Sequence, residues 1–259
     1  TRDLMSRPLR IEYPGAWYHV MNRGAGRQRI FHSDSARKIF LDLLGEVSQL
    51  YFIQIHAYSL MNNHYHLLVH TPRSGLSRAM RHLNGVYTRK ANQERKSDGP
   101  LFRGRYKALL VQSDEYLLEL VRYIHMNPVE AGLCRHPRDH RWTSHRAYLF
   151  GGVRPKWLCT EEVLGRFEGS RKQSLREMSD FVCQAIPESV RKGLLEERVI
   201  LGTKWFKEWV YDNWKDKNTK KGIPLRDQRM CERATIKTVL ESVGHAWNVS
   251  VKDLRMGGR

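Results

Sequence analysis

Two spacings of apolar residues alternate along the first 150 positions of this 259-residue chain. Short runs rich in β-branched and aromatic residues predict strands, and apolar residues that recur every three or four positions predict helices. The predicted strands cover residues 16–21, 51–60, 64–69 and 106–111. The predicted helices cover residues 33–50, 76–94 and 113–127.

The order of these elements indicates a fold. Strand, helix, strand, strand, helix and strand, followed by one more helix, is the order of the ferredoxin-like split βαβ arrangement. It predicts an α+β fold whose central strands include residues 64–69. Ser33 and Ser113 are the predicted N-caps of two helices, and Pro128 is the predicted stop of the second.

The charge of the chain indicates its partner. Lys and Arg outnumber Asp and Glu by 45 to 27, which gives a formal net charge of +18. An excess of this size is typical of proteins that bind a polyanion. Because the sequence has no run of 18 apolar residues, we expect nucleic acid rather than a membrane. Its four Cys residues lie far apart without a C-x-x-C pair, which indicates free thiols in a reducing cytoplasm.

The run His64-Tyr65-His66 lies inside a predicted strand. Side chains alternate between the faces of a strand, so the two imidazoles point to one side and Tyr65 points to the other. Two imidazoles on a rigid strand provide half of a metal site. The alternative is that both are ordinary strand residues, and a third ligand with a reactive group decides between the two.

The predicted helix over residues 113–127 carries such groups. Tyr123 and Asn127 are four residues apart and therefore project from one helix face. An amide oxygen from Asn127 would complete three neutral ligands with His64 and His66, which leaves the full charge of a divalent ion to polarise a phosphodiester. Tyr123 would lie beside the phosphorus, where a cation favours its phenolate. This arrangement suits transesterification.

Several separated motifs together resemble a known family. They are RPLRIEYPG (7–15), YHVMNRG (18–24), HYH (64–66), LFRGRY (101–106), YIHMNPV (123–129) and WTSHRAY (142–148). In this order they are similar to the single-tyrosine HUH transposases and, more narrowly, to the REP-associated tyrosine transposases of bacteria. The resemblance covers roughly residues 5–152.

The resemblance implies an HUH nuclease domain that binds single-stranded DNA with palindromic, REP-like hairpins and cuts it beside them. It implies His64, His66 and Asn127 as the ligands of Mg²⁺ or Mn²⁺ and Tyr123 as the nucleophile. The products would be a 5′-phosphotyrosine and a free 3′-hydroxyl. Imidazole ligands suit Mn²⁺ better than Mg²⁺, and the physiological ion stays open. A monomer is favoured, with a dimer that exchanges its tyrosine helix as the alternative.

A nuclease must also hold its strand, and clustered basic residues are the expected phosphate contacts. These are Arg7, Arg10, Arg23, Arg78, Arg81, Arg103, Arg105 and Lys107. Tyr18 is the expected base-stacking residue. A solvated protein surface is the alternative for any one of the basic residues.

After two glycines at positions 151 and 152 the pattern becomes helical. We therefore predict the HUH domain over residues 5–152 and a helical C-terminal region over residues 153–259. Residues 234–255 combine a helical pattern, a Gly-bearing turn and a new capping signal, and are similar to the start of a DnaA-type helix-turn-helix. A small helical appendage is the alternative.

The leading hypothesis is a metal-dependent transposase that acts in the bacterial cytoplasm, at the nucleoid. A domesticated hairpin-binding protein without turnover is the second hypothesis, and a rolling-circle nickase is the third. Such nickases commonly use a second tyrosine. Tyr116 lies two turns from Tyr123, about 10 Å along the helix axis, which is too far for both to share one metal.

Overall fold

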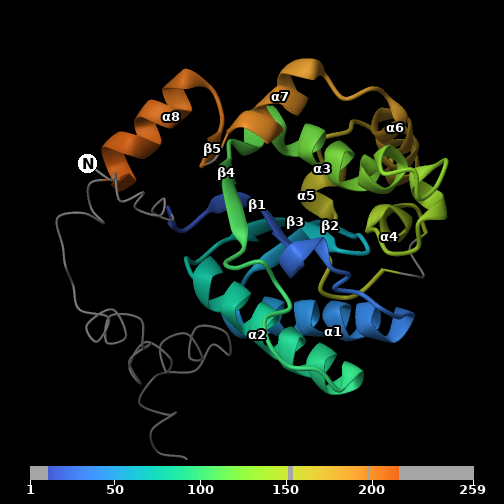
Figure 1. The fold of residues 1–259 in the computed structure, drawn as a ribbon. Coiled ribbons are helices and arrows are strands. Elements are labelled where there is room, and N and C mark those ends of the chain that lie inside the picture. The colour runs from blue at the N-terminus through green and yellow to red at the C-terminus, as the bar shows by residue number, and fades with distance from the viewer. Residues whose placement is uncertain (1–10, 151–153, 198, 216–259) are drawn as a thin grey trace, which may run out of the picture. The chain divides into compact units, whose positions relative to one another are not determined.

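The computed structural model describes residues 11–150, 154–197 and 199–215 (Figure 1). Arg7, Arg10 and the segment 234–255 lie outside these residues, so their roles stay predictions. The described strands are β1 (Ala16–Arg23), β2 (Gln54–Leu60), β3 (His64–Thr71), β4 (Lys107–Val111) and β5 (Ile200–Leu201). The described α-helices are α1 (Asp34–Tyr51), α2 (Leu76–Arg95), α3 (Ser113–Glu130), α4 (His145–Leu149), α5 (Glu161–Leu164), α6 (Arg171–Cys183), α7 (Glu188–Glu196) and α8 (Lys204–Val210).

The strands form one sheet in the order β2-β3-β1-β4-β5. β1 lies in the middle and pairs antiparallel with β3 on one side and β4 on the other, and β2 and β3 form a hairpin. The first four strands with α1 and α2 are the ferredoxin-like arrangement, so the predicted α+β fold is confirmed. β5 pairs parallel with β4 and extends the sheet by one strand.

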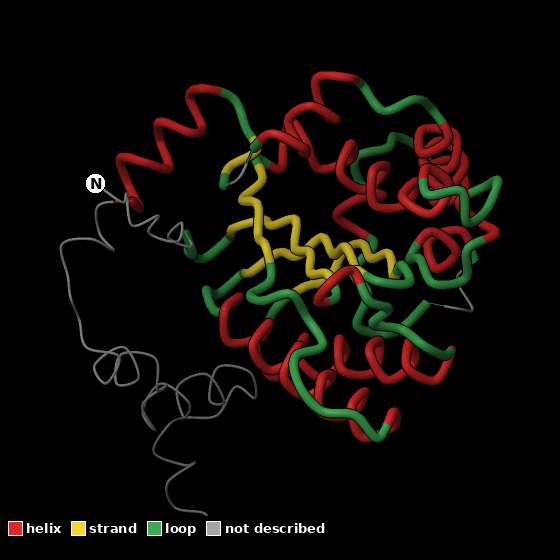
Figure 2. The backbone as a smooth tube through the Cα atoms, in the orientation of Figure 1, coloured by secondary structure: helices red, strands yellow, loops and turns green. Residues whose placement is uncertain are grey.

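Helices cover both faces of this sheet, as Figure 1 and Figure 2 show. On one face, the ring of Tyr65 packs against Phe40 of α1 at 4.9 Å between centroids, and its hydroxyl donates to Oδ1 of Asn84 in α2 at 2.9 Å. On the other face, α3 brings Tyr123 against His66. Because side chains alternate along β3, Tyr65 and every second residue after it face α1 and α2, while the histidines and Leu68 face α3.

Segments that follow the ferredoxin-like core close both edges of the sheet. Along β2, the backbone nitrogen of Leu60 donates to the Trp142 carbonyl at 2.9 Å, and that of Cys159 donates to the Ile55 carbonyl at 2.9 Å. Along β4, β5 occupies the outer edge. The outer edges of β2 and β4 therefore already have backbone partners from this chain.

The helices after residue 153 also pack on α3. Arg122 of α3 is buried, donates from Nη1 to the Ala185 carbonyl at 2.8 Å and lies 3.7 Å from the ring centroid of Phe181. Contacts group residues 1–214 into one compact unit and residues 215–259 into a second. The boundary predicted at residue 152 therefore does not coincide with this grouping. In the described part, no helix is long and apolar enough to cross a membrane.

The ends of α3 differ from the prediction. Ser113 is the first helical residue, and Gln112 is the N-cap, with its side-chain oxygen accepting from the Thr203 nitrogen at 2.8 Å. Pro128 lies inside the helix, which continues to Glu130. A proline so near the end removes only one backbone hydrogen bond, and the last turn closes through other donors, such as the Ala131 nitrogen.

The N-cap of α1 provides a test of this assignment. Oγ of Ser33 accepts from the Ala36 nitrogen at 3.0 Å, so Ser33→Ala should lower the free energy of unfolding by about 1 kcal/mol. Ser113→Ala is the matched control and should change it by less than about 0.5 kcal/mol. Urea unfolding of the full chain measures both, and equal losses would contradict the assignment of the caps.

Candidate active site

His19, His64 and His66 cluster on the face of the sheet that α3 covers. In the antiparallel register of β1 and β3, Arg23 lies opposite His64 and Met21 lies opposite His66. His19 is two residues before Met21 and so points to the same face. The ring centroids of His64 and His66 are 5.1 Å apart, as are those of His19 and His66. The predicted pair is therefore part of a cluster of three imidazoles.

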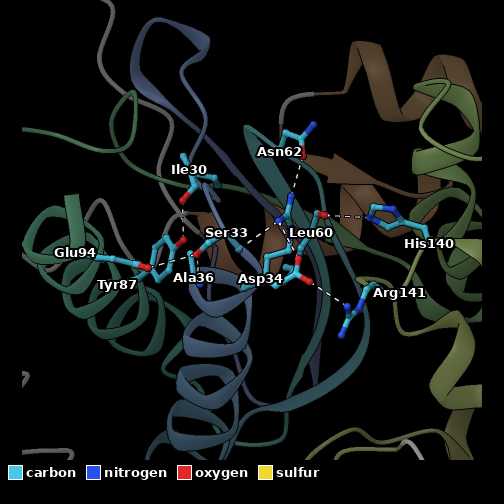
Figure 3. Close-up of polar contacts among 11 residues, drawn as sticks. Ile30, Ser33, Asp34, Ala36, Leu60, Asn62, Tyr87, Glu94, His140 and Arg141 are labelled. Atoms are coloured by element: carbon cyan, nitrogen blue, oxygen red, sulfur yellow. Dashed lines mark hydrogen bonds and ion pairs between the residues drawn. The ribbon is translucent and has the colours of Figure 1, made fainter.

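The turn before β3 is held in place from several sides. Asn62 accepts at its backbone carbonyl from the nitrogens of Ile30 and Phe31, at 2.9 and 3.1 Å. Its Oδ1 accepts from Nη2 of Arg37 in α1 at 2.8 Å, and Figure 3 shows this contact beside the start of α1. His64 follows this turn directly, so its backbone position is defined by the turn.

Burial keeps the three imidazoles neutral. It lowers the pKa of His64 to about 4, with the charge of Arg23 acting in the same direction, and lowers the pKa of His19 to about 3. The pKa of His66 falls well below its usual value because the ring is buried beside the other two imidazoles and Arg23. Neutral imidazole is the form that binds a metal ion.

A hydrogen bond fixes which nitrogen of His64 carries the proton. Nδ1 of His64 lies 2.7 Å from Oδ1 of Asn63, and Nδ2 of Asn63 donates to the Arg27 carbonyl at 3.1 Å. A carbonyl only accepts, so the amide nitrogen faces Arg27 and the amide oxygen faces His64. Nδ1 of the neutral ring therefore donates, and Nε2 keeps a lone pair.

His66 is bonded to another imidazole. Its Nδ1 lies 2.8 Å from Nε2 of His19. Both rings are buried, and Nδ1 of His19 has no hydrogen-bond partner among the described residues. Nε2 of His66 is therefore the nitrogen of that ring that can face a metal.

α3 adds a tyrosine and an amide to the histidine cluster. The ring of Tyr123 meets the rings of His66 and His19 edge-on, each at 5.7 Å between centroids. Asn127 lies one turn further along α3, and its Nδ2 donates to the Tyr123 carbonyl at 2.8 Å. Because the amide donates through nitrogen, Oδ1 is its remaining donor atom toward a metal.

Burial raises the pKa of the Tyr123 phenol above its usual value. The side chain of Asn127 acts in the opposite direction, as do the guanidinium groups of Arg191 and Arg23. The net effect keeps the phenol protonated at neutral pH. A nucleophilic role for Tyr123 therefore requires a cation beside its oxygen.

The donor set fits a divalent ion of the predicted kind. No three His, Cys, Asp or Glu residues in the described part of the chain form a metal-binding group. The candidate set is instead two imidazoles and an amide: Nε2 of His64, Nε2 of His66 and Oδ1 of Asn127. Such a set suits Mn²⁺, and Mg²⁺ less well, and leaves positions open for phosphate oxygens.

The loop of residues 101–105, called here the basic loop, lies beside the start of β3. Gly24 forms a β-bridge with Phe102, and the backbone nitrogen of Arg103 donates to the Arg23 carbonyl at 2.9 Å. The side chains of Arg23, Arg103 and Arg105 are exposed. Since Arg23 pairs with His64, the structure brings these three predicted DNA contacts together next to the histidines.

The other basic residues lie elsewhere. Arg78 and Arg81 are exposed on α2, which covers the face of the sheet opposite α3 (Figure 1). Lys107 is exposed at the start of β4, close to the basic loop in sequence. The predicted set is therefore divided between the site and the opposite face.

The base-stacking role predicted for Tyr18 is wrong. Its side chain is only 2% exposed, and its hydroxyl donates to the Ile11 carbonyl at 2.9 Å. Tyr18 faces α1 and α2 because it alternates with His19 along β1. A ring held in the core offers no face to a nucleic-acid base.

Sequence reasoning missed two residues of this site, His19 and Asn63. The signal for His19 was present, since it lies at an alternate position of a predicted strand. Recognising its role required the pairing of that strand with β3, which the sequence pattern does not give. Asn63 directly precedes His64, in the gap between the predicted strands over residues 51–60 and 64–69.

The chain is similar to a known protein family and to solved structures. Residues 12–127 match the family described as "Transposase IS200 like". Among solved structures, a REP-associated tyrosine transposase bound to a REP hairpin is similar at a TM-score of 0.50 and 17% identity, over 60% of this chain and 92% of that one. A Deinococcus radiodurans R1 protein assigned as a transposase gives 0.33 and 19%, over 46% and 93%. No curated protein matches the chain.

The fold is that of the solved REP-associated tyrosine transposase structure. Residues 12–127 match the IS200-like transposase family, so the resemblance carried by the sequence motifs is confirmed for that part of the chain. The activity of this family is of the transposase type, a DNA-processing reaction.

The buried histidines predict how stability depends on pH. Burial against Trp17 and near His70 lowers the pKa of His56 to about 3. Its unfolded form takes up a proton below pH 6.5 that the folded form does not, so the free energy of unfolding falls as the pH drops toward 4. His56→Leu should reduce this slope by about 1.4 kcal/mol per pH unit near pH 5.

Urea unfolding between pH 7 and pH 4.5 measures the slope, whatever the absolute stability of the variant. His32→Leu, at an exposed position, is the matched control and should leave the slope as in the wild type. An unchanged slope in His56→Leu would contradict the neutral, buried state of His56.

Proposed function

We propose that this protein is a metal-dependent transposase that cleaves and rejoins single-stranded DNA at hairpins through a 5′-phosphotyrosine. The observation that carries the proposal is the position of Tyr123. Its ring lies edge-on to His66 of the same chain, with Asn127 one helical turn away. The same ring also meets His19 edge-on, so two buried imidazoles contact the phenol.

In this proposal His64, His66 and Asn127 hold Mn²⁺ or Mg²⁺. When bound, the ion polarises the scissile phosphate and favours the phenolate of Tyr123. The phenol oxygen attacks phosphorus, its proton passes to water, and an O–P bond forms as the bond to the 3′-oxygen breaks. The 3′-oxygen takes up a proton and leaves as a hydroxyl. Attack by a 3′-hydroxyl on the phosphotyrosine reverses the step and rejoins the strand.

The chain's own residues would orient the strand for this step. Arg23, Arg103 and Arg105 form an exposed basic group next to His64, where they can contact phosphates on either side of the scissile bond. Such contacts position DNA without reading its sequence. Because α3 sits on the histidines of its own chain, the site needs no second subunit, and we propose a monomer.

The hairpin is proposed as partner because the similar transposase structure is described as bound to a REP hairpin, and because the chain carries a net charge of +18. The third hypothesis, a two-tyrosine nickase, is not favoured. Tyr116 is half-buried and lies two turns before Tyr123 on α3.

Removal of the nucleophile provides the first test. Tyr123→Phe should abolish the covalent protein–DNA adduct formed with a single-stranded hairpin oligonucleotide in Mn²⁺, because no other tyrosine in the described part of the chain contacts the rings of His19 or His66. Denaturing gel electrophoresis measures the adduct. Tyr116→Phe is the matched control and should keep it.

His64→Ala should also abolish cleavage, while the hairpin affinity stays within about threefold because basic residues supply most of the binding. This pair of results separates the transposase from the hairpin-binding protein without turnover. A wild-type chain that binds hairpins and forms no adduct in either ion would favour the latter.

The basic loop gives a second test. Arg103→Gln/Arg105→Gln should weaken binding of the hairpin and lower the slope of log affinity against log salt by about 1.4, the value for two phosphate contacts on a single strand. Lys172→Gln/Arg176→Gln on α6 removes the same charge from exposed positions outside the predicted contacts and should leave the slope nearly unchanged. Fluorescence anisotropy over a salt series measures both, and equal effects would contradict a specific role for the loop.

A further inference from the structure

We propose that Asn63 and His19 are positioning residues that accept hydrogen bonds from Nδ1 of His64 and of His66 when the Nε2 atoms of the two rings bind a metal ion. The inference rests on the proposed function, since it takes the two histidines as ligands. Asn63 and His19 touch no substrate in this account. They act through hydrogen bonds to the opposite nitrogen of each ring.

The role of Asn63 follows from the direction of two hydrogen bonds. The amide nitrogen of Asn63 donates to the Arg27 carbonyl at 3.1 Å, and the amide oxygen lies 2.7 Å from Nδ1 of His64. An amide oxygen can only accept, so the proton of His64 sits on Nδ1. Asn63 therefore both sets the tautomer of His64 and fixes the rotation of its ring.

The role of His19 follows from the 2.8 Å contact between its Nε2 and Nδ1 of His66. One nitrogen must donate and the other must accept. If His19 donates, the proton of His66 sits on Nε2 and blocks the metal. If His66 donates from Nδ1, its Nε2 has a lone pair for the metal. Metal binding at His66 thus selects His19 as the acceptor.

The hydrogen bonds of Asn63 and His19 differ in one respect that an experiment can detect. The tautomer of His64 is the same with and without metal, because an amide oxygen offers no alternative. In the metal-binding arrangement, the proton of His19 sits on Nδ1, a buried atom without a hydrogen-bond partner among the described residues. An unpaired buried donor is unfavourable, so the opposite arrangement competes until a metal binds.

Outer hydrogen bonds of this kind typically change metal affinity by 10- to 100-fold. We therefore expect His19→Leu and Asn63→Ala to weaken Mn²⁺ binding by about 10- to 100-fold. His19→Gln and Asn63→Asp keep an acceptor oxygen facing the ligand and should recover most of the affinity. His56→Leu, a buried histidine on the same sheet face that contacts Trp17, should bind Mn²⁺ as the wild type does.

Titration calorimetry of the full chain with Mn²⁺ measures these affinities without reference to activity. The expected result is loss in the two variants without an acceptor and recovery in the two that retain one. Wild-type affinity in His19→Leu and Asn63→Ala, or equal loss in His19→Gln and His19→Leu, would overturn the proposal.

The variant His66→Ala distinguishes a failure of the proposed metal site from a failure of the proposed positioning role. If the wild type and His66→Ala bind Mn²⁺ alike, the histidines are not the metal site, and the proposed function fails together with this inference. If only His66→Ala loses affinity, the metal site stands and the positioning role fails. Histidine ¹⁵N spectra add a direct readout, since His64 should carry its proton on Nδ1 in both the metal-free and the Mg²⁺-bound protein.

Discussion

The register of β1 against β3 is the constraint on which the site depends. Its two ends are tied by backbone bonds, from Gly15 to the Thr71 carbonyl at 2.7 Å and from Gly24 to the Asn63 carbonyl at 2.9 Å. Within this register the ring of His19 meets that of His66, and Arg23 at the end of β1 binds the basic loop beside His64. A shift of one residue would turn the His19 side chain to the other face of the sheet, toward α1 and α2. No hydrogen bond to His66 could then form.

The second requirement is that α3 is fixed in its position over the histidine face of the sheet. Residues on either side of Tyr123 are anchored. Arg122 bonds the Ala185 carbonyl, and Nε2 of His125 lies 2.7 Å from Oγ of Ser144, which in turn accepts from the Tyr58 nitrogen of β2 at 2.9 Å. The motif that contains Ser144 is therefore structural in this chain. It links the tyrosine helix to the edge of the sheet.

The fold was largely predictable from the sequence, because periods of two and of three to four residues separate strands from helices even without homologues. Residues of the candidate site were predictable only where their spacing in the sequence puts them on one face of a strand or helix, as for His64 with His66 and for Tyr123 with Asn127. Spacing does not report which strands pair, so His19 was missed and Tyr18, its neighbour on the opposite face, was placed at the surface. The start of α3 depends on a tertiary contact of Gln112 with Thr203 that no local rule includes.

The most direct measurement is to identify the residue joined to DNA. After reaction with a hairpin oligonucleotide and Mn²⁺, nuclease trimming and trypsin digestion, fragment spectra locate the remaining nucleotide. Cleavage after Arg122 and Arg135 gives a peptide whose only tyrosine is Tyr123. The account predicts the nucleotide on Tyr123 through its 5′-phosphate. A nucleotide on Tyr116, or on any other residue, would contradict it.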